Sequence, residues 1–307
     1  MTIINLESDG LYPQLIVIFR AVTHSGKINA DELLRVCYPG AVTDSSVINR
    51  LRGILSRWTE LGLFSEENDE ISLNKQFAKP RGMSIDAFTE KLPSFCRTLI
   101  MQPQNCLPLW SDAGTRSEEG VGRGADFVRG VSWSLAQDIF NLPIGSAESI
   151  ESVEGTQMTG GKFIFLNRTR WPGFRFWASY LGFASGDGSS FQIDPTKAIN
   201  EALPSVFGAK KELLAADFLN ALSSILPVLD FGKYRMEVES ILDPTVWRKP
   251  TENHLSMSLS FALRRLELNQ LIKLQGRADT GSSFRLTGRD FKTWNGFESV
   301  VWSGGKR

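Results

Sequence analysis

Three helices are predicted in the first 62 residues, because apolar residues recur there at spacings of three and four. Their ranges are 11–23, 30–38 and 44–61, and each is followed by glycine or Pro-Gly, which end helices. Two short runs typical of strands come next, at 63–65 and 71–73. The sequence Glu-Glu-Asn-Asp-Glu joins them as an acidic turn. The first 80 residues therefore predict three helices and a hairpin.

The same order of elements is predicted near the C-terminus. Helical spacing covers 210–226, 230–242 and 255–268, and a strand over 271–274, a turn over 278–283 and a returning strand over 284–287 follow. This second hairpin is basic, whereas the first is acidic. The basic residues that flank its turn are Lys273, Arg277, Arg285 and Arg289.

The middle of the chain predicts helices over 84–102 and 125–140, joined by a loop. Pro93 predicts a kink or a later start in the first of them. The glycine-rich run within 111–124 lacks the preceding strand and the Gly-Lys-Ser/Thr sequence of a phosphate-binding loop. We therefore interpret this run as a linker.

Arginines alternate with aromatic residues over 163–184. Such interleaving is typical of surfaces that stack single-stranded nucleic acid. Phe174, Trp177, Tyr180 and Leu181 also lie at helical spacing, which favours a buried core instead. The sequence leaves both interpretations open and favours the core.

Three junctions share one pattern, in which a predicted helix ends and a hairpin begins. Their sequences are Leu61-Gly62-Leu63-Phe64, Leu181-Gly182-Phe183-Ala184 and Leu268-Asn269-Gln270-Leu271-Ile272. Three short helices followed by a hairpin resemble the winged helix-turn-helix family. We therefore expect a mainly α protein with short β-hairpin wings, in which tandem winged helix-turn-helix units surround a helical, aromatic-rich central region.

The expected domains follow from this pattern. They are a winged helix-turn-helix unit over 1–80, a central helical domain over 81–207 that resembles a degenerate winged unit, a winged helix-turn-helix unit with a basic wing over 208–290, and a basic tail over 291–307.

Charge is distributed unevenly, although 34 basic residues balance 34 acidic ones. Residues 248–307 hold eleven basic and five acidic side chains, whereas residues 1–80 hold eight and ten. A basic surface attracts nucleic acid or an acidic partner. Basic tails that only aid solubility are the competing interpretation.

The resemblance to winged helix-turn-helix proteins implies that the third helix enters the major groove and the wing contacts the DNA backbone. Arginine and asparagine read base edges, and serine suits phosphates. The candidate DNA-binding residues are Asn49, Arg50, Arg52 and Arg57 in the first unit and Ser256, Ser260, Arg264, Arg265, Lys273, Arg277, Arg285 and Arg289 in the second. The alternative is that these arginines are only solvated and bind no ligand. The acidic first hairpin favours this alternative for the first unit, because DNA phosphates would repel the hairpin.

Composition excludes several classes of protein. No apolar run is long enough to span a membrane, and the start of the chain lacks the pattern of a signal peptide, so we expect a cytoplasmic protein. Three cysteines and two histidines form no metal-ligand pattern, and no nucleophile–base pair is visible. We expect no enzyme activity, no catalytic residue, no cofactor and no metal.

The tandem arrangement with its Trp-Pro-Gly-Phe-Arg-Phe-Trp centre resembles the DpdG family, accessory proteins of bacterial gene clusters that insert 7-deazaguanine derivatives into DNA and restrict unmodified DNA. The resemblance implies a non-catalytic protein of a restriction or phage-defence system, with double-stranded DNA and proteins of a defence complex as partners. Two alternatives stay open: an assembly adaptor that binds a protein through the acidic hairpin and the aromatic centre, and a transcriptional regulator.

Overall fold

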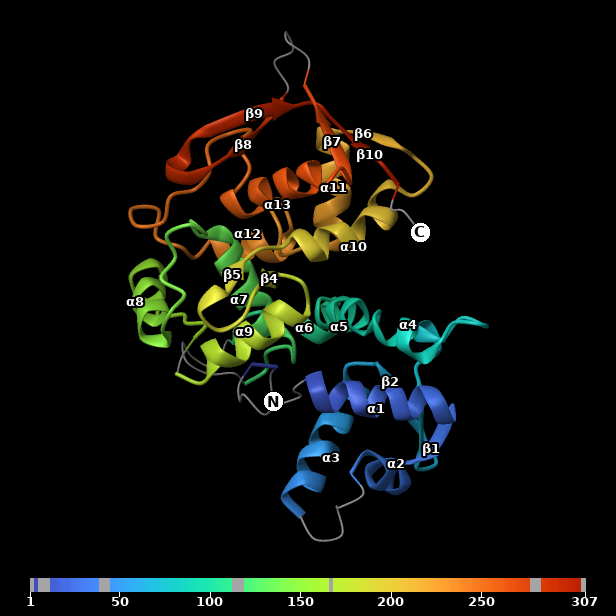
Figure 1. The fold of residues 1–307 in the computed structure, drawn as a ribbon. Helices are drawn as coiled ribbons and strands as arrows, with labels where there is room; N and C mark the ends of the chain where they lie inside the picture. Colours follow the sequence, from blue (N-terminus) through green and yellow to red (C-terminus); the bar gives the residue numbers. More distant parts are fainter. Residues whose placement is uncertain are drawn as a thin grey trace.

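The computed structural model describes residues 3–4, 12–38, 45–111, 119–165, 168–276 and 283–304. The protein is mainly helical with small antiparallel sheets, as expected. Its N-terminal helices and its C-terminal sheets lie at opposite ends of the molecule, with the central helices between them (Figure 1). No helix among the described residues has the length and apolar character needed to cross a bilayer.

The helices are α1 (Tyr12–Ser25), α2 (Ala30–Cys37), α3 (Ser45–Glu60), α4 (Ile85–Thr89), α5 (Leu92–Ile100), α6 (Pro103–Cys106), α7 (Ala125–Ala136), α8 (Ala147–Gln157), α9 (Arg170–Tyr180), α10 (Thr196–Phe207), α11 (Ala215–Ile225), α12 (Lys233–Glu239) and α13 (Met257–Leu268). The strands are β1 (Lys27–Asn29), β2 (Phe64–Glu67), β3 (Glu70–Leu73), β4 (Ala184–Ser185), β5 (Gln192–Ile193), β6 (Glu212–Leu214), β7 (Ile272–Gln275), β8 (Phe284–Thr287), β9 (Thr293–Phe297) and β10 (Ser299–Trp302). Short 3-10 turns are η1 (Lys75–Phe77), η2 (Gly188–Ser190) and η3 (Arg289–Phe291).

The N-terminal elements contain the predicted three helices and hairpin. Asn29 is the N-cap of α2, because its side chain accepts hydrogen bonds from the backbone N–H groups of Asp31 and Glu32. Asn68 and Asp69 both have positive φ, as the tight turn between β2 and β3 requires. The sequence missed β1, which is only three residues long and pairs with β3 in a sheet of order β1-β3-β2.

The C-terminal sheet has the corresponding order β6-β10-β7. The expected strand over 284–287 is confirmed as β8, but its expected pairing with the strand over 271–274 is wrong, because β7 pairs with β10 and β8 pairs with β9. The expected start of a helix at 210 is also wrong, since 212–214 form β6 and α11 begins at Ala215. Apolar and polar side chains alternate over 284–287, and this pattern suits a strand beside any partner. Periodicity alone therefore did not identify the partner.

The three junctions noted in the sequence share one backbone geometry. The second residue after each helix has a positive φ: Gly62 at 93°, Gly182 at 83° and Gln270 at 58°. The next residue then donates a backbone hydrogen bond to the carbonyl five positions earlier, over 2.8, 2.8 and 3.0 Å, as in a Schellman motif. Glycine adopts this conformation without strain, whereas Gln270 does so at some cost.

The hairpins after these junctions close in the same way. Asn74 donates its backbone N–H to Leu63, Asp194 to Phe183 and Ser303 to Leu271, over 2.9–3.0 Å. The third hairpin is longer because β8 and β9 are inserted between its two strands. The prediction of three related junctions is therefore confirmed at the level of backbone hydrogen bonds.

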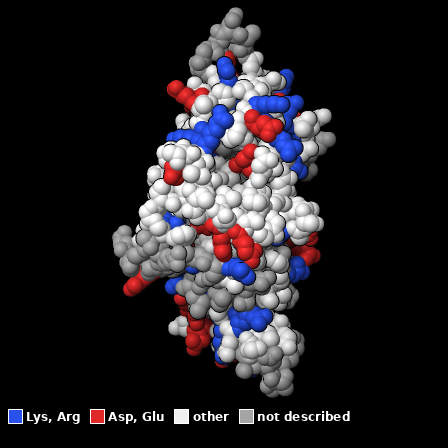
Figure 2. Space-filling model, turned by 90° about the vertical axis from the view of Figure 1, so that its left-hand side faces the viewer, with Lys and Arg blue, Asp and Glu red and all other residues white. Residues whose placement is uncertain are grey.

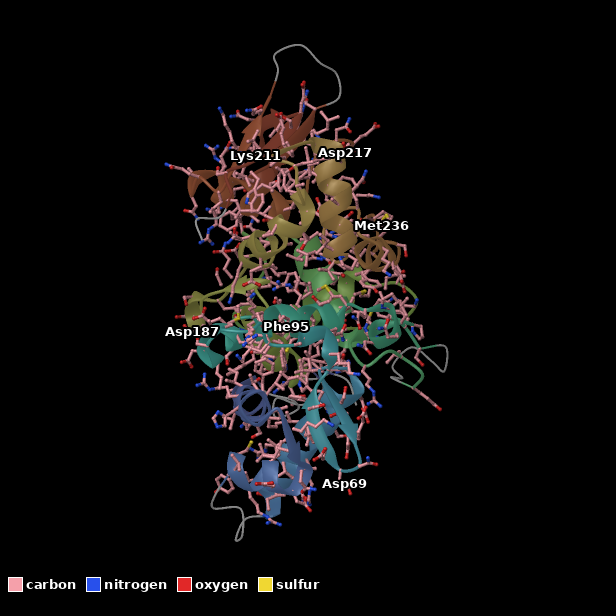
Figure 3. All side chains as sticks on the ribbon, turned by 90° about the vertical axis from the view of Figure 1, so that its right-hand side faces the viewer. Asp69, Phe95, Asp187, Lys211, Asp217 and Met236 are labelled. Carbon is pink, nitrogen blue, oxygen red and sulfur yellow. The ribbon has the colours of Figure 1, made fainter. Side chains whose placement is uncertain are left out.

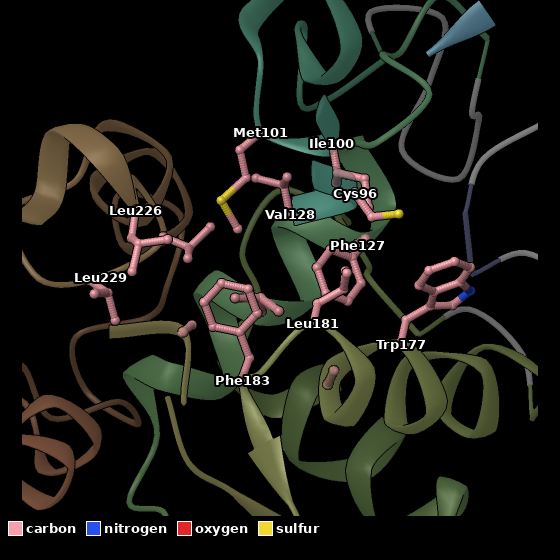
Figure 4. Packing of buried hydrophobic residues seen from close by; sticks show 14 of the residues in the cluster. Cys96, Ile100, Met101, Phe127, Val128, Trp177, Leu181, Phe183, Leu226 and Leu229 are labelled. Atoms are coloured by element: carbon pink, nitrogen blue, oxygen red, sulfur yellow. The ribbon is translucent and has the colours of Figure 1, made fainter. Parts of the chain in front are cut away.

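Helix α7 forms the centre of the core, and every one of its residues is buried. Phe127 and Val128 lie between Trp177 on one side and Leu226 on the other (Figure 4). Phe174, Trp177 and Leu181 are at most 1% exposed, which confirms the core interpretation for these residues and excludes them from a stacking surface. In the same region Asp126 accepts hydrogen bonds from the backbone N–H groups of Ile3 and Ile4 and ties them to α7.

Candidate nucleic-acid interface

Seven exposed basic residues gather in the C-terminal part of the chain, and we name them the C-terminal basic surface. They are Arg248, Lys249, Arg264, Lys273, Arg285, Arg289 and Lys292. They come from the segment after α12, from α13, β7 and β8, and from η3 and the residue after it. Figure 2 shows basic side chains over the end of the molecule that carries these elements, with a few acidic side chains among them.

Most members of this surface have no carboxylate partner in the part of the chain that the structure describes. Arg264 forms an ion pair with Glu267 at 2.5 Å. The other six members have no carboxylate within 4.0 Å among the described residues. An exposed cation without a carboxylate partner keeps its full attraction for phosphate. The arrangement therefore suits contact with a polyanion.

Arg265 was expected to contact DNA, but it has a structural partner. Its guanidinium forms an ion pair with Asp194, whose side chain is 3% exposed. Asp194 also accepts a hydrogen bond from the backbone N–H of Thr196 at the start of α10. Arg265 thus connects α13 to α10, and a DNA contact would remove the partner of a buried carboxylate.

Ser256 and Ser260 were expected on an exposed face of their helix, and this expectation is wrong. Ser256 is 3% exposed and Ser260 is fully buried. Ser256 is the N-cap of α13, where its hydroxyl accepts a hydrogen bond from Leu259 and donates one to Asp230. The hydroxyl of Ser260 accepts a hydrogen bond from the backbone N–H of Thr287 in β8. Both hydroxyls hold α13 in place.

The first two turns of α13 are covered by neighbouring elements. Between Met257 and Leu263 only Phe261 retains partial exposure. Helices α7 and α10 and strand β8 pack against α13. The hydroxyl of Ser258, for example, donates a 2.6 Å hydrogen bond to the carbonyl of Leu135 in α7. In this structure α13 presents only its last turns to solvent.

The remaining predicted residues of the second unit lie on or beside strands. Lys273 is exposed on β7, Arg285 on β8 and Arg289 in η3. Arg277 lies outside the described residues. The described basic residues therefore lie on β7, on β8 and in η3, at the same end of the molecule (Figure 1).

Helix α3 of the N-terminal unit has an open face. Asn49 and Arg50 are exposed, and Arg52 is exposed with an ion pair to Asp31 at 3.0 Å. The expectation that Arg57 shares this face is wrong, because Arg57 is 8% exposed. Its position falls on the buried side of α3, one residue before the fully buried Trp58.

The β2–β3 hairpin carries a cluster of exposed carboxylates. Glu66, Glu67, Asp69 and Glu70 are all exposed, and only Glu70 has a basic partner among the described residues, Lys27 at 3.7 Å. Asp69 lies at the tip of the hairpin, at the end of the molecule that holds the N-terminal helices (Figure 3), and its backbone carbonyl accepts a 3.0 Å hydrogen bond from the backbone N–H of Ala30. This hairpin would be repelled by DNA phosphates and attracted by a basic surface.

One buried carboxyl stands out among the titratable groups. Burial raises the pKa of Glu154 to about 7, although its oxygens accept hydrogen bonds from the backbone N–H groups of Ile164 and Phe165. No group of three or more His, Cys, Asp and Glu side chains placed to hold a metal occurs among the described residues. Glu154 holds a loop of the central region, so we assign it a structural role.

Two exposed aromatic residues near the basic surface were not identified from the sequence. Trp294 on β9 is 37% exposed and lines a groove of about 630 Å³ with Arg264 and Asn295. Phe291 is 38% exposed, and the guanidinium of Arg248 lies 4.2 Å from the centre of its ring. The region after 288 carries no clear periodicity, so only the fold shows that these rings border the basic residues.

The fold defines a mainly helical protein in which two three-stranded sheets of the same strand order flank a helical core. The family model for DpdG-like proteins matches residues 1–280, so the chain belongs to the DpdG-like family. This family membership associates the chain with the 7-deazaguanine modification system of DNA. No curated protein and no solved structure matches the chain.

Proposed function

We propose that the N-terminal and C-terminal units are winged helix-turn-helix modules. Support comes from the element order helix, strand, helix, helix, hairpin over α1–β3, and from its counterpart α10, β6, α11, α13, β7 and β10. In both units the short strand pairs with the last strand of the hairpin. The C-terminal module differs by two insertions, one around α12 and one that forms β8 and β9.

The protein as a whole is, in this proposal, a non-catalytic DNA-binding component of a bacterial 7-deazaguanine DNA modification and restriction system. The observation that carries the proposal is the C-terminal basic surface, in which six of seven exposed cations lack a carboxylate partner among the described residues. Family membership supplies the biological setting. Duplex DNA is the polyanion that such a system acts on.

The C-terminal basic surface contacts backbone phosphates in this proposal. Each neutralised phosphate releases counterions, so affinity falls with salt at a slope of about 0.9 per phosphate contact. Strands and turns, rather than the covered helix α13, carry most of the contacts. Asn49 and Arg50 on the open face of α3 provide a second contact, since both side-chain types form two hydrogen bonds with base edges.

The test is fluorescence anisotropy of a labelled duplex against the full chain over a salt series. Arg285→Glu combined with Arg289→Glu is expected to weaken binding by at least about tenfold and to reduce the salt slope. Lys75→Glu combined with Arg81→Glu is the matched control, because it makes the same charge change at exposed residues outside the C-terminal basic surface. Equal losses in both double variants would contradict the assignment of the surface.

A second candidate function is protein assembly through the β2–β3 hairpin. The exposed carboxylates of that hairpin favour it, because they suit a basic partner and not DNA. The variant to test replaces Glu66, Glu67 and Glu70 by glutamine. Loss of a co-purifying partner in this variant, with duplex affinity unchanged, would assign assembly to the hairpin and leave DNA binding to the C-terminal basic surface.

A further inference from the structure

A small pocket of about 260 Å³ lies beside the C-terminal basic surface. It forms where the ends of α7 and α8 and the segment 246–257 meet β8 and η3. Its volume is below the roughly 300–1,000 Å³ of sites for drug-sized ligands, so it has room for one ring system. Of the residues that line the pocket, only Arg248 belongs to the C-terminal basic surface.

Buried polar side chains line this pocket. Gln137, Gln157, Ser256 and Thr287 are each at most 7% exposed. The hydroxyl oxygen of Thr287 is buried and has no hydrogen-bond partner among the described residues. A buried hydroxyl without a partner is costly, and it is satisfied when a ligand or water supplies the missing bond.

The two amides retain unused hydrogen-bonding capacity. Gln157 accepts a 3.0 Å bond from the indole of Trp133 and donates a 2.9 Å bond to Gln137, which in turn donates to the Trp133 carbonyl. A primary amide has two N–H donors and an oxygen with two lone pairs. Each amide therefore has one donor and one acceptor position beyond these bonds.

Two flat side chains, an aromatic ring and a guanidinium, also line the pocket. Phe291 and Arg248 both line the pocket, and the Arg248 guanidinium lies 4.2 Å from the centre of the Phe291 ring. Asp290 and Phe291 have φ of 58° and 59°, a conformation that strains non-glycine residues. Strained backbone of this kind concentrates at ligand sites. An aromatic ring and a guanidinium are both surfaces on which a heterocycle stacks.

Exposed cations surround these residues in the chain. Lys249 follows Arg248, and Arg289 and Lys292 flank the segment that contains Phe291. A phosphate attached to a ligand in the pocket would therefore lie near positive charge. The pocket combines a mainly apolar lining that contains buried polar groups, a stacking surface and neighbouring cations, which are features that recognise a nucleotide.

We infer that this pocket binds a single nucleobase, which stacks on Phe291 and Arg248 and forms hydrogen bonds with Thr287, Gln137 or Gln157. The inference rests on the proposed DNA binding, because DNA is the source of the base. The base that enters the pocket is unpaired and leaves the duplex stack. Proteins that hold such a base read its edge with hydrogen bonds and stack its faces on flat side chains.

The test compares a fully paired duplex with the same duplex carrying one unpaired, bulged base, by anisotropy with the full chain. The wild type is expected to bind the bulged duplex at least about tenfold more tightly, the fold-change that one stacked base contributes. Phe291→Ala and Thr287→Val are expected to lose this preference and keep the affinity for the paired duplex. Phe176→Ala, at an exposed phenylalanine of α9, is the control that keeps the preference.

A parallel arm measures binding of free nucleosides by equilibrium dialysis, which separates failure of the inference from failure of the proposed function. Nucleoside binding lost in Phe291→Ala supports the pocket even if no duplex binds, and then assigns it a free ligand. Equal binding of both duplexes together with no nucleoside binding overturns the inference and leaves DNA binding in place. A bulge preference that survives in both pocket variants also overturns it.

Discussion

Helices α3 and α13 occupy the same place in two units of equal strand order, yet they differ in what they expose. Helix α3 presents Asn49 and Arg50 to solvent, whereas the first two turns of α13 are buried. The difference comes from β8 and α7, which pack on α13, whereas α10 packs on α13 as its counterpart α1 packs on α3. Equal strand order therefore does not give equal exposure: the second unit carries exposed basic residues on β7 and β8, and the first two turns of its helix α13 are covered.

Equivalent positions on the two helices test this comparison most strongly. Ser260 in α13 corresponds to Arg52 in α3, because each lies ten residues before the positive-φ residue of its junction. Ser260→Arg is expected to destabilise the protein by about 3–5 kcal/mol, since it buries an unpaired charge. Arg52→Ser is expected to cost under about 1 kcal/mol, because it removes an exposed ion pair. Urea unfolding measures both, and similar costs would contradict the contrast in burial.

Carboxyl groups give a second contrast, between buried Glu154 and the exposed carboxylates of the β2–β3 hairpin. The folded-state pKa of Glu154 is raised from 4.5 to about 7, so the folded protein holds a proton that the unfolded chain has lost. Stability is therefore expected to fall as pH rises from about 4.5 to about 7, by up to about 3 kcal/mol.

Unfolding free energy measured between pH 5 and 8 checks this expectation. Glu154→Gln is expected to flatten the pH dependence, whereas Glu67→Gln on the hairpin leaves it unchanged. An unaltered profile in Glu154→Gln would show that another group causes the decline.

The helix–hairpin junctions provide a third contrast, in which substitutions at two equivalent positions are expected to change stability in opposite directions. Gly62→Ala is expected to destabilise the protein by about 1–2 kcal/mol, because φ of 93° is unfavourable for a residue with a Cβ atom. Gln270→Gly is expected to stabilise it by up to about 1 kcal/mol, since glycine relieves the strain at φ of 58°. Thermal unfolding of the two variants gives the signs, and equal signs would refute the equivalence of the junctions.

The smallest expected effects are on the salt slope of duplex binding. They distinguish Arg264, which has a carboxylate partner, from the other members of the C-terminal basic surface, which have none among the described residues. Arg289→Ala is expected to lower the salt slope of duplex binding by about 1, as for the loss of one phosphate contact. Arg264→Ala is expected to change it less, because Glu267 already neutralises that guanidinium. A larger change for Arg264 would indicate that its ion pair opens when DNA binds.

The sequence by itself determined the local structure of this protein. Apolar spacing located the helices of the N-terminal unit, and the Leu-Gly pairs marked the ends of α3 and α9. These features depend on residues within one or two turns of each other, and such local preferences are written directly in the order of side chains. The DpdG-like family was likewise identified from the order of elements and the aromatic centre.

Only the tertiary structure decided which faces of these elements meet solvent. The partner of β7, the burial of Ser256 and Ser260, the ion pair of Arg265 with Asp194 and the pocket at Thr287 all depend on contacts between segments at least 24 positions apart in the chain. A polar stripe on a helix looks the same in sequence whether water or another element covers it. Burial is a property of what packs against a residue, and that is fixed only when distant segments come together.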